Sequence, residues 1–518
     1  MEDCVELAKK LGKRVGDELE IPVYLYENAA QSEDRRNLAN VRKGEYEGLE
    51  EKLKKPEWNP DFGPAVFNRK SGALAISARE FLIAYNIDLN TKNKKHATDI
   101  AFELREKGRS VRADTNSAYY FKGDLVKYRQ DYFPCTECNL EFVAKNVDDL
   151  EAHYQREHGF SIIELLAEHG TTPENIIGRS VKKRGIFTHC KAIGWVVEEY
   201  GRAQISINLT NYKITPPHIV LEKARKLAAE RGLIVTGSEI VGLVPYQAML
   251  MAGKYYLEKQ GSSTGIPPQD IIEAAIYSMG LNDVALFDPD DKIIGMPKTR
   301  NDSLIEMKTG NFIDEVSRSS PAPGGGSVAA LAGSLGAALS SMVANLTVPK
   351  QETHKDALPY IKIAERAQDI RARLSVAIDD DTQAFNDYLE AIRLPKKTKT
   401  EAETRQVAIQ EGLKTAVNVP LNTSKASLEA LMLSLEIGRT GNLASVSDAG
   451  VGAEMAFAGL MGGILNVLIN LGEIEDRKFI VDMKKQCEEL EKHGRQLLGE
   501  CLEVVRTRID QLTNKKGG

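Results

Sequence analysis

The chain has 518 residues, of which 42% are hydrophobic and 27% are charged, and its formal net charge is −6. This length predicts about two to four domains, and the acidic balance excludes a general attraction to nucleic acid or anionic membranes. The six cysteines are too few for a disulfide framework. Because residues 1–20 do not resemble a signal peptide, we expect a cytoplasmic protein.

The first half of the sequence alternates predicted helices and strands. Glu2–Glu18 has the apolar spacing of an amphipathic helix, and Ile21–Tyr26 has the residue types of a strand. The elements expected next are a loop at Asp61–Ala73, a strand at Phe81–Leu89, a helix at Lys95–Lys107, strands at Ile193–Val197 and Ala203–Leu209, a helix at His218–Arg231 and a strand at Leu233–Ser238. This order predicts an α/β sandwich that is incomplete at its N-terminus.

Residues from about 113 to 184 interrupt this alternation with a zinc-finger-like motif. Two cysteines and two histidines have a spacing that can close a tetrahedral zinc site, above a small core that includes Phe142 and Leu150. The four predicted ligands are Cys135, Cys138, His153 and His158. The alternative is a pair of cysteines near unrelated histidines. Acidic residues surround the predicted finger helix, so we expect a structural or protein-contact role and not nucleic-acid binding.

The second half is helical by periodicity, beyond a polar linker at about Phe287–Asn311. Its most informative segment is Ser319–Ser327, in which two prolines and three glycines precede a helix. A glycine-rich turn at a helix start suits carboxylate or phosphate groups. The next segment, Val328–Val348, has no charged residue and is long enough to cross a bilayer. Its Ala, Gly and Ser content instead predicts a core helix of a bundle, with no membrane contact.

The motifs of both halves together resemble glutamate formiminotransferase fused to formiminotetrahydrofolate cyclodeaminase, a bifunctional folate enzyme of histidine degradation. The resemblance rests on Ile21–Tyr26, Gly44–Glu47, Asn59–Pro64, Phe81–Ile87, Ile193–Trp195, Val241–Pro245, Ala322–Ala330, Asp379–Phe385 and Gly441–Asp448. It implies a multidomain chain, an α+β sandwich followed by an all-α bundle. The implied parts are 1–81 (partial transferase N-subdomain), 82–285 (C-subdomain with the insertion), 286–311 (linker) and 312–518 (cyclodeaminase).

The resemblance implies two reactions. The helical half would convert 5-formiminotetrahydrofolate to 5,10-methenyltetrahydrofolate and ammonia, and the first half would transfer the formimino group from formiminoglutamate to tetrahydrofolate. In the family, the catalytic histidine lies in a His-Pro-Arg-like motif within a stretch that precedes this chain's first residue. We therefore expect an active cyclodeaminase and a transferase half without its base. The alternative is that the first half is a non-catalytic, folate-binding assembly module stabilised by zinc.

The resemblance also implies site residues. Asp379 and Asp381 match the family's Asp-x-Asp, and Asp379 is the first choice as proton donor to the leaving nitrogen; the alternative is a solvated acidic helix face. For Asp448 the alternative to a pterin contact is a helix cap. The expected folate-binding residues are Gly63, Pro64, Phe67, Asn68, Arg69, Gly72, Gly324, Gly325, Gly326, Ser327, Asn442 and Asp448. The implied partners are a folate, with or without a polyglutamate tail, and further copies of the chain.

Overall fold

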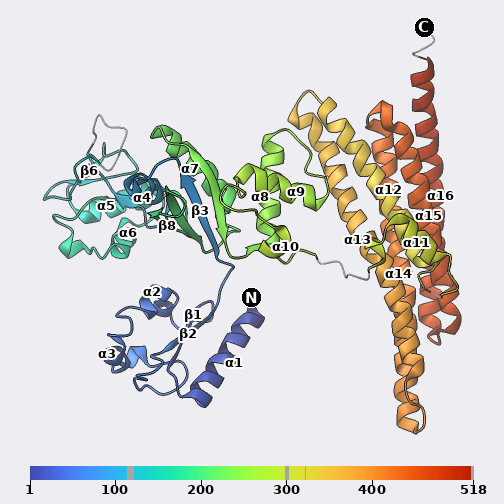
Figure 1. Cartoon of the computed structure of the whole chain (residues 1–518), viewed down its shortest axis with the longest axis horizontal. Coiled ribbons are helices and arrows are strands. Elements are labelled where there is room, and N and C mark those ends of the chain that lie inside the picture. Colours follow the sequence, from blue (N-terminus) through green and yellow to red (C-terminus); the bar gives the residue numbers. More distant parts are fainter. Residues whose placement is uncertain (114–121, 298–302, 321, 515–518) are drawn as a thin grey trace. The chain divides into compact units, whose positions relative to one another are not determined.

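The computed structural model describes residues 1–113, 122–297, 303–320 and 322–514 (Figure 1). The chain divides into two compact units, Met1–Val235 and Thr236–Gly518. The first unit is mixed α/β, and the second is almost entirely helical. This arrangement confirms the predicted fold class.

Two sheets organise the first unit. In the smaller sheet, β1 (Val23–Glu27) lies parallel to β2 (Leu74–Ala78), with Val23 opposite Leu74, and α1 (Glu2–Leu19) packs against both strands. In the larger sheet, the antiparallel strands are β3 (Ile83–Leu89), β9 (Arg202–Leu209) and β8 (Cys190–Val197). Helices α4 (Lys94–Leu104) and α7 (Pro217–Glu230) pack on this sheet. The apolar strands and amphipathic helices predicted from sequence therefore form, with ends that differ by at most three residues.

Several short elements complete the first unit. In its first part they are α2 (Leu38–Val41) and α3 (Leu49–Leu53). Between α4 and β8 lie β4 (Arg109–Ser110), β5 (Phe133–Pro134), β6 (Val143–Ala144), α5 (Val147–His153), α6 (Ile162–Glu168) and β7 (Lys182–Lys183). These strands form two small antiparallel pairs, β4 with β7 and β5 with β6. The insertion has its own core, centred on Leu150, Tyr154 and Ile162, which explains how it interrupts the sheet without disordering it.

The second unit begins with a small α/β part. Its helices are α8 (Tyr246–Lys259), α9 (Pro268–Met279), α10 (Pro289–Lys292) and α11 (Thr309–Val316), and its strands are β10 (Val235–Val241), β11 (Val244–Pro245) and β12 (Ile293–Ile294). The segment predicted as a polar linker contains α10 and β12, and Phe287 and Leu304 in it are buried. In the described residues on either side of 298–302, these two buried side chains make core contacts that the charged composition does not indicate.

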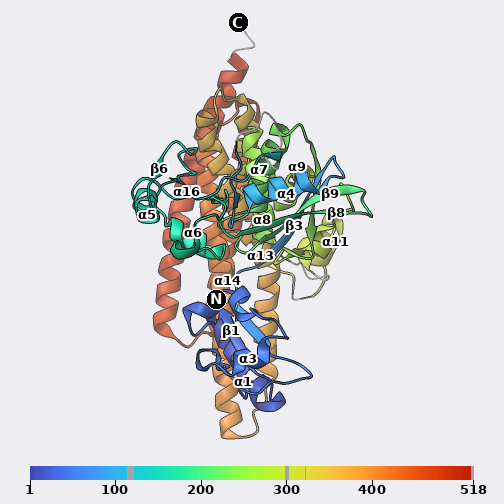
Figure 2. The ribbon, with the colours of Figure 1, turned by 90° about the vertical axis from the view of Figure 1, so that its left-hand side faces the viewer.

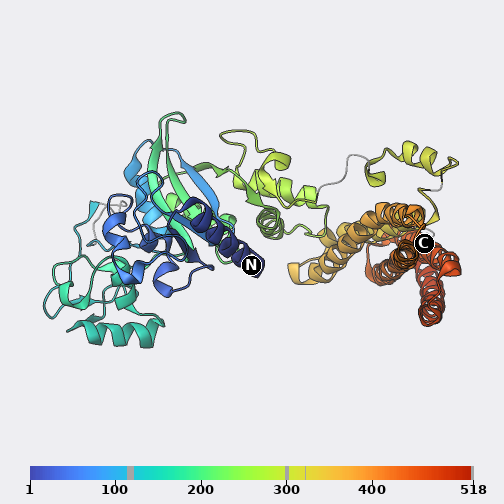
Figure 3. The same cartoon turned by 90° about the horizontal axis from the view of Figure 1, so that it is seen from below.

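Five long helices form the bundle of the second unit. They are α12 (Gly325–Thr347), α13 (His354–Arg393), α14 (Lys399–Thr440), α15 (Val446–Asn470) and α16 (Arg477–Asn514). Figure 2 shows α13, α14 and α16 alongside one another, and Figure 3 views the helices nearer to their ends. Small residues let α12 and α15 approach closely: a Cβ on Gly336 would meet the Gly452 carbonyl oxygen at 2.7 Å. The small-residue composition thus produces the tight core that the sequence predicts.

Two segments of the described bundle are long and apolar enough to cross a membrane, Gly325–Lys350 and Leu443–Glu473. Of their most apolar windows, 61% and 39% respectively are buried inside the structure. Length and composition alone therefore do not distinguish a membrane-spanning helix from a core helix in these two segments. The absence of membrane contact stays a prediction.

Candidate functional site

A cavity of about 370 Å³ lies where four helices of the bundle meet. Its lining comes from the turn before α12, the last third of α13, the first half of α14 and the end of α15. The lining residues are Ala322, Gly324, Gly325, Asp381, Thr382, Phe385, Tyr388, Leu413, Ala416, Asn466, Ile469, Asn470 and Glu473. The cavity brings together the glycine-rich turn and Asp381, one of the two predicted catalytic aspartates. The turn and Asp381 are more than fifty residues apart in sequence.

Asp381 lies beside the first turn of α12. The backbone N–H of Ser327 donates to its carboxylate, and the Ser327 hydroxyl, 3.4 Å from Oδ2, offers a weaker second contact. Burial raises the pKa of Asp381 and outweighs these hydrogen bonds, which lower it. A carboxyl with a raised pKa beside a cavity can hold a proton and deliver it to a bound molecule.

Gly326 makes this position of Asp381 possible. A Cβ at residue 326 would come well inside 3.0 Å of the Asp381 carboxylate. Gly324 and Gly325 line the cavity, whereas Gly326 and Ser327 are buried behind it. The Ser327 hydroxyl donates to the Ile378 carbonyl oxygen at 2.8 Å. The four residues predicted to bind folate here thus divide into two at the cavity and two that position Asp381.

Asp379 has different partners. Its Oδ2 accepts from the Ser303 hydroxyl at 2.6 Å, and its Oδ1 accepts from the Leu304 backbone N–H at 2.7 Å. Both oxygens therefore fix the short helix at residues 304–306. Asp379 is not among the residues that line the cavity. The two aspartates lie two residues apart on α13 and point to different neighbours, as helical periodicity requires.

Two aromatic side chains of this cavity were not predicted as site residues. Phe385 provides an aromatic surface, and Tyr388 donates from its hydroxyl to Glu473 at 2.5 Å. Asn466 and Asn470 also line the cavity, and they donate their amide N–H to the carbonyl oxygens of Gly462 and Ala416. The sequence did contain a signal for them: Phe385 and Tyr388 follow Asp381 by four and seven residues, and this spacing places all three side chains on one face of a helix.

Asn442 and Asp448 lie at the opposite end of α15 from the cavity. The side chain of Asn442 caps the turn at residues 443–445 and accepts from Lys350 at 2.6 Å. Asp448 is half-buried in the first turn of α15, where Ser445 and not Asp448 is the N-cap residue. Eighteen residues separate Asp448 from Asn466, which is about 27 Å along a helix. Within one chain, these residues and Asp381 do not surround the same cavity.

The predicted folate loop of the first unit forms a well-defined turn. Gly63 adopts a φ of +79° and packs against Gly16 of α1, and Gly72 adopts a φ of +66° and donates to the Asn68 carbonyl oxygen. Phe67 packs on Tyr46, with ring centroids 5.2 Å apart. Pro64 is half-buried, and the Arg69 side chain is exposed while its carbonyl oxygen accepts from Tyr46. The structure thus explains the loop's shape, and folate binding by it stays a prediction.

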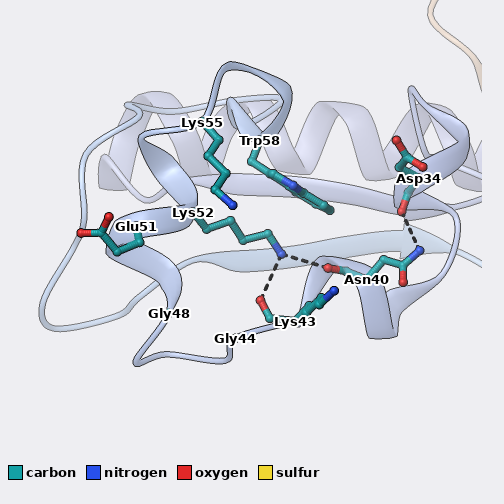
Figure 4. A pocket seen from close by; sticks show the side chains of 9 residues that line it. All are labelled: Asp34, Asn40, Lys43, Gly44, Gly48, Glu51, Lys52, Lys55 and Trp58. Carbon is teal, nitrogen blue, oxygen red and sulfur yellow. Dashed lines mark hydrogen bonds between the residues drawn. The ribbon is translucent and has the colours of Figure 1, made fainter. Parts of the chain in front are cut away.

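A second feature of this region is a cavity of about 420 Å³ around Lys52 (Figure 4). The Lys52 ammonium group donates to the carbonyl oxygens of Asn40 and Val41 at 2.9 and 2.6 Å, and it lies 3.7 Å from the ring centroid of Trp58. Burial lowers the pKa of Lys52 to about 8. These contacts hold the end of α2 in place, so Lys52 has a structural function that its lysine-rich surroundings conceal in the sequence.

The four predicted metal ligands converge in the insertion. Their ligand atoms all lie within 4.8 Å of one another. His153 Nε2 and His158 Nε2 are 3.3 Å apart, and the Cys135 and Cys138 sulfurs lie 3.3 to 3.4 Å from histidine nitrogens. Tetrahedral zinc with ordinary bond lengths requires about 3.3 Å between nitrogens and about 3.6 Å between sulfur and nitrogen. The donor set and its spacing therefore fit a zinc ion.

Local structure explains how the two histidines meet. Five residues separate His153 from His158, which would place them about 140° apart around an ordinary α-helix. Residues 154–158 instead form a wider π-helical turn, and this brings both rings to one side. Phe142 stacks on His153 at 3.7 Å, and Leu150 is fully buried beneath the cluster. The small core predicted under the site is confirmed.

Comparison with known proteins gives the family. Three family models match: "Formiminotransferase domain, N-terminal subdomain" at residues 1–79, "Formiminotransferase domain" at 171–297 and "Formiminotransferase-cyclodeaminase" at 308–489. A formimidoyltransferase-cyclodeaminase of Dictyostelium discoideum is 35% identical over 98% of this chain and 81% of its own length. A methenyltetrahydrofolate cyclohydrolase of Methylorubrum extorquens is 37% identical over 38% of this chain and 96% of its own.

A solved structure of formiminotetrahydrofolate cyclodeaminase from Thermotoga maritima shares 26% identity, covering 39% of this chain and 98% of that one, with a TM-score of 0.35. Both transferase models match, and the N-terminal one matches from residue 1. The expectation of a disabled transferase half therefore gains no support from these matches. The chain belongs to the bifunctional formimidoyltransferase-cyclodeaminase family, the folate enzymes of histidine degradation.

Proposed function

We propose that the bundle cavity is the site at which 5-formiminotetrahydrofolate closes to 5,10-methenyltetrahydrofolate, with Asp381 as the proton donor. The observation that carries this proposal is the position of Asp381, which lines the cavity and has a pKa raised by burial. Asp379, the first choice on sequence grounds, has both oxygens occupied by Ser303 and Leu304. Asp379 does not line the cavity, so its carboxyl is not placed to reach a molecule bound there.

The proposed reaction uses one proton from Asp381. N10 of the folate attacks the formimino carbon that N5 carries, forming the second carbon–nitrogen bond of the ring, and its own proton passes to the formimino nitrogen. Asp381 protonates the formimino nitrogen, which leaves as ammonia when its bond to carbon breaks. The resulting carboxylate then faces the methenyl cation and stabilises it electrostatically. The aromatic surface of Phe385 lies in the same cavity and suits a flat pterin ring.

For the first unit we propose formimino transfer from formiminoglutamate to tetrahydrofolate, with the loop at residues 63–72 contributing to folate binding. The two transferase models and the Dictyostelium relative support this activity. The alternative is the folate-binding assembly module predicted above. Both proposals place a structural zinc ion on Cys135, Cys138, His153 and His158, whose geometry fits it. We further propose that the protein works as a cytoplasmic homo-oligomer.

A second candidate reaction for the bundle is hydrolysis of methenyltetrahydrofolate. It is favoured by the cyclohydrolase of Methylorubrum extorquens, which this chain matches over 96% of that protein. Both reactions share the methenyl cation and differ in the nucleophile and leaving group. A carboxyl at Asp381 could deliver a proton in the first reaction or accept one from water in the second.

The test is a pair of assays on the purified full chain. In the first, the protein receives 5-formiminotetrahydrofolate, and the absorbance of methenyltetrahydrofolate is followed. In the second, it receives formiminoglutamate and tetrahydrofolate. Product in both supports the two proposed activities, and product in the first alone supports the assembly-module alternative. No product in either, with enzyme-dependent loss of added methenyltetrahydrofolate, would replace ring closure with the hydrolytic reaction.

A further inference from the structure

A large basic cavity of about 800 Å³ lies along α4 in the first unit. One wall is the face of α4 that carries Thr98, Phe102 and Arg105, and the other comes from the base of the insertion. The lining residues are Asn93, Lys94, Lys95, Thr98, Asp99, Phe102, Arg105, Arg109, Ser110, Arg112, Leu125, His169 and Lys182. Six of these side chains are lysine or arginine, and one is a carboxylate.

That carboxylate does not offset the positive charge in the cavity. Asp99 is 1% exposed, and its two oxygens accept from Arg109 at 2.6 Å and from Arg231 at 2.8 Å. Glu103 accepts from Arg109 at 2.8 Å. The acidic groups behind the wall are therefore already paired with two arginines. Among the described residues, neither Arg105 nor Lys182 has an ion pair with a carboxylate.

The unpaired cations are held in place by neutral partners. Arg105 donates through Nε to the Gly108 carbonyl oxygen at 2.8 Å, and its guanidinium lies 3.7 Å from the ring centroid of Phe102. Lys182 donates to the Ser110 hydroxyl at 2.9 Å. Each cation retains further N–H donors beyond these bonds. The cavity thus presents half-buried donors in fixed positions, which lowers the ordering cost of binding an anion.

The titration behaviour of the wall agrees with this geometry. Burial, followed by the positive charge of neighbouring residues, lowers the pKa of Arg105 and of Lys182. The same causes lower the pKa of His169 to about 4. Its Nε2–H donates to the Lys107 carbonyl oxygen at 2.7 Å. Cations held close together in this way favour the binding of a negatively charged group.

We propose that this cavity binds a small polyvalent anion bearing phosphate or carboxylate groups, held chiefly by Arg105 and Lys182. The concave shape favours a small molecule over a nucleic acid, which needs an extended basic face. The nearby finger helix also carries Asp148, Asp149 and Glu151, whose charge repels phosphates. Most of the lining lies within residues 80–170, between the two transferase models. The lining shares no residue with the Asp381 cavity or with the loop at residues 63–72, so the proposed site is distinct from both proposed folate sites.

Isothermal titration calorimetry on the full chain tests the proposal. Fructose 1,6-bisphosphate is the phosphate probe and tricarballylate the carboxylate probe, both at low ionic strength, and the tighter probe identifies the anionic group. We expect Lys182→Gln to raise the Kd of the tighter-binding probe at least about tenfold. The matched control is Lys183→Gln, because its strand position faces away from Lys182 and does not line the cavity. This control should change affinity by less than about twofold.

A second variant and a second readout protect the test against misfolding. Arg105→Gln should weaken binding similarly, with an unchanged thermal transition in both variants. Binding of the anion should raise the pKa of His169, which is measured by histidine NMR between pH 4 and 7. The proposal is overturned if neither probe binds below about 1 mM, or if Lys183→Gln weakens binding as much as Lys182→Gln. It is also overturned if a short oligonucleotide binds more tightly and in competition with both probes.

Discussion

The Cys and His cluster of the insertion and the Asp381 cavity of the bundle are built in opposite ways. The cluster draws all its ligands from residues 135–158, and a hairpin followed by one helical turn brings them together. The cavity draws its lining from residues 322–473, on four helices. Local spacing determines the first site, and packing between distant segments determines the second. The geometry of a site built from nearby residues can therefore be predicted from their spacing. The geometry of a site built from distant segments can be predicted only once the fold is known.

The two regions also differ in what the ligand contributes. A metal ion in a small insertion supplies much of the free energy that folds it. The bundle has its own large apolar core, and its cavity holds a carboxyl whose ionised form is disfavoured by burial. The insertion should lose structure when its metal is removed, whereas the bundle should keep its structure and lose only catalytic activity when the Asp381 carboxyl is replaced. The following predictions test this contrast.

The largest expected effect is the loss of catalytic activity caused by Asp381→Asn. Loss of the proton donor should lower kcat for ring closure by about 10² to 10⁴-fold, while the helical content and zinc content stay unchanged. The measurement is the steady-state rate of methenyltetrahydrofolate formation. If this variant keeps more than a tenth of wild-type activity and Asp379→Asn does not, the proton donor is Asp379.

The next effect is structural and concerns Cys138→Ser. Removal of one thiolate should abolish stoichiometric zinc binding, whose apparent free energy in small domains is about 10 to 16 kcal/mol. Residues of the insertion should then become sensitive to limited proteolysis, while ring closure stays within about twofold of wild type. The control is Cys4→Ser, since Cys4 is exposed and lies outside the cluster. A variant that retains one zinc ion per chain would show that these residues are not the ligands.

A smaller effect is expected for Asp379→Asn. This variant keeps one acceptor oxygen and loses one of the hydrogen bonds to Ser303 and Leu304. Unfolding of the helical unit should become easier by about 1 kcal/mol, and kcat should change by less than about threefold. Urea unfolding followed by circular dichroism measures the first quantity. A large loss of kcat with unchanged KM would contradict the structural function assigned to this residue.

The smallest effect is the pH dependence of stability in Asp381→Asn. Burial raises the folded-state pKa of Asp381 above its unfolded value, so its contribution to stability is present at low pH and is lost as pH rises through the folded pKa. Replacing it with neutral asparagine removes this loss. The variant should therefore unfold at higher urea than wild type at pH 7, and the difference should shrink below about pH 4. An equal or lower midpoint at pH 7 would mean that the Ser327 hydrogen bonds outweigh burial.

The sequence predicted what depends on neighbouring residues. Alternating apolar residues located β3, amphipathic spacing located α1, and the Cys and His spacing located the metal ligands. It ranked Asp379 ahead of Asp381 as proton donor, because their different surroundings depend on Ser303 and on the start of α12, both remote in sequence.

The same limit applies to other residues. Asn442 and Asp448 were predicted to bind folate because their motif matches the family, whereas the structure places them at the other end of α15 from the cavity. Lys52 and the basic cavity on α4 were not predicted at all. Lysine and arginine are common on helix surfaces. Only the tertiary structure shows which of them are buried or half-buried without a carboxylate partner.

The close approach of Gly326 to Asp381 has a consequence for natural variation. Any side chain at residue 326 would displace the carboxylate, so the two positions are linked as a pair. In an allele where codon 326 alone specifies alanine or serine, we expect the start of α12 or the Asp381 carboxylate to shift. Genotyping that single codon would therefore flag alleles in which the proposed ring closure is impaired, although the aspartate itself is intact.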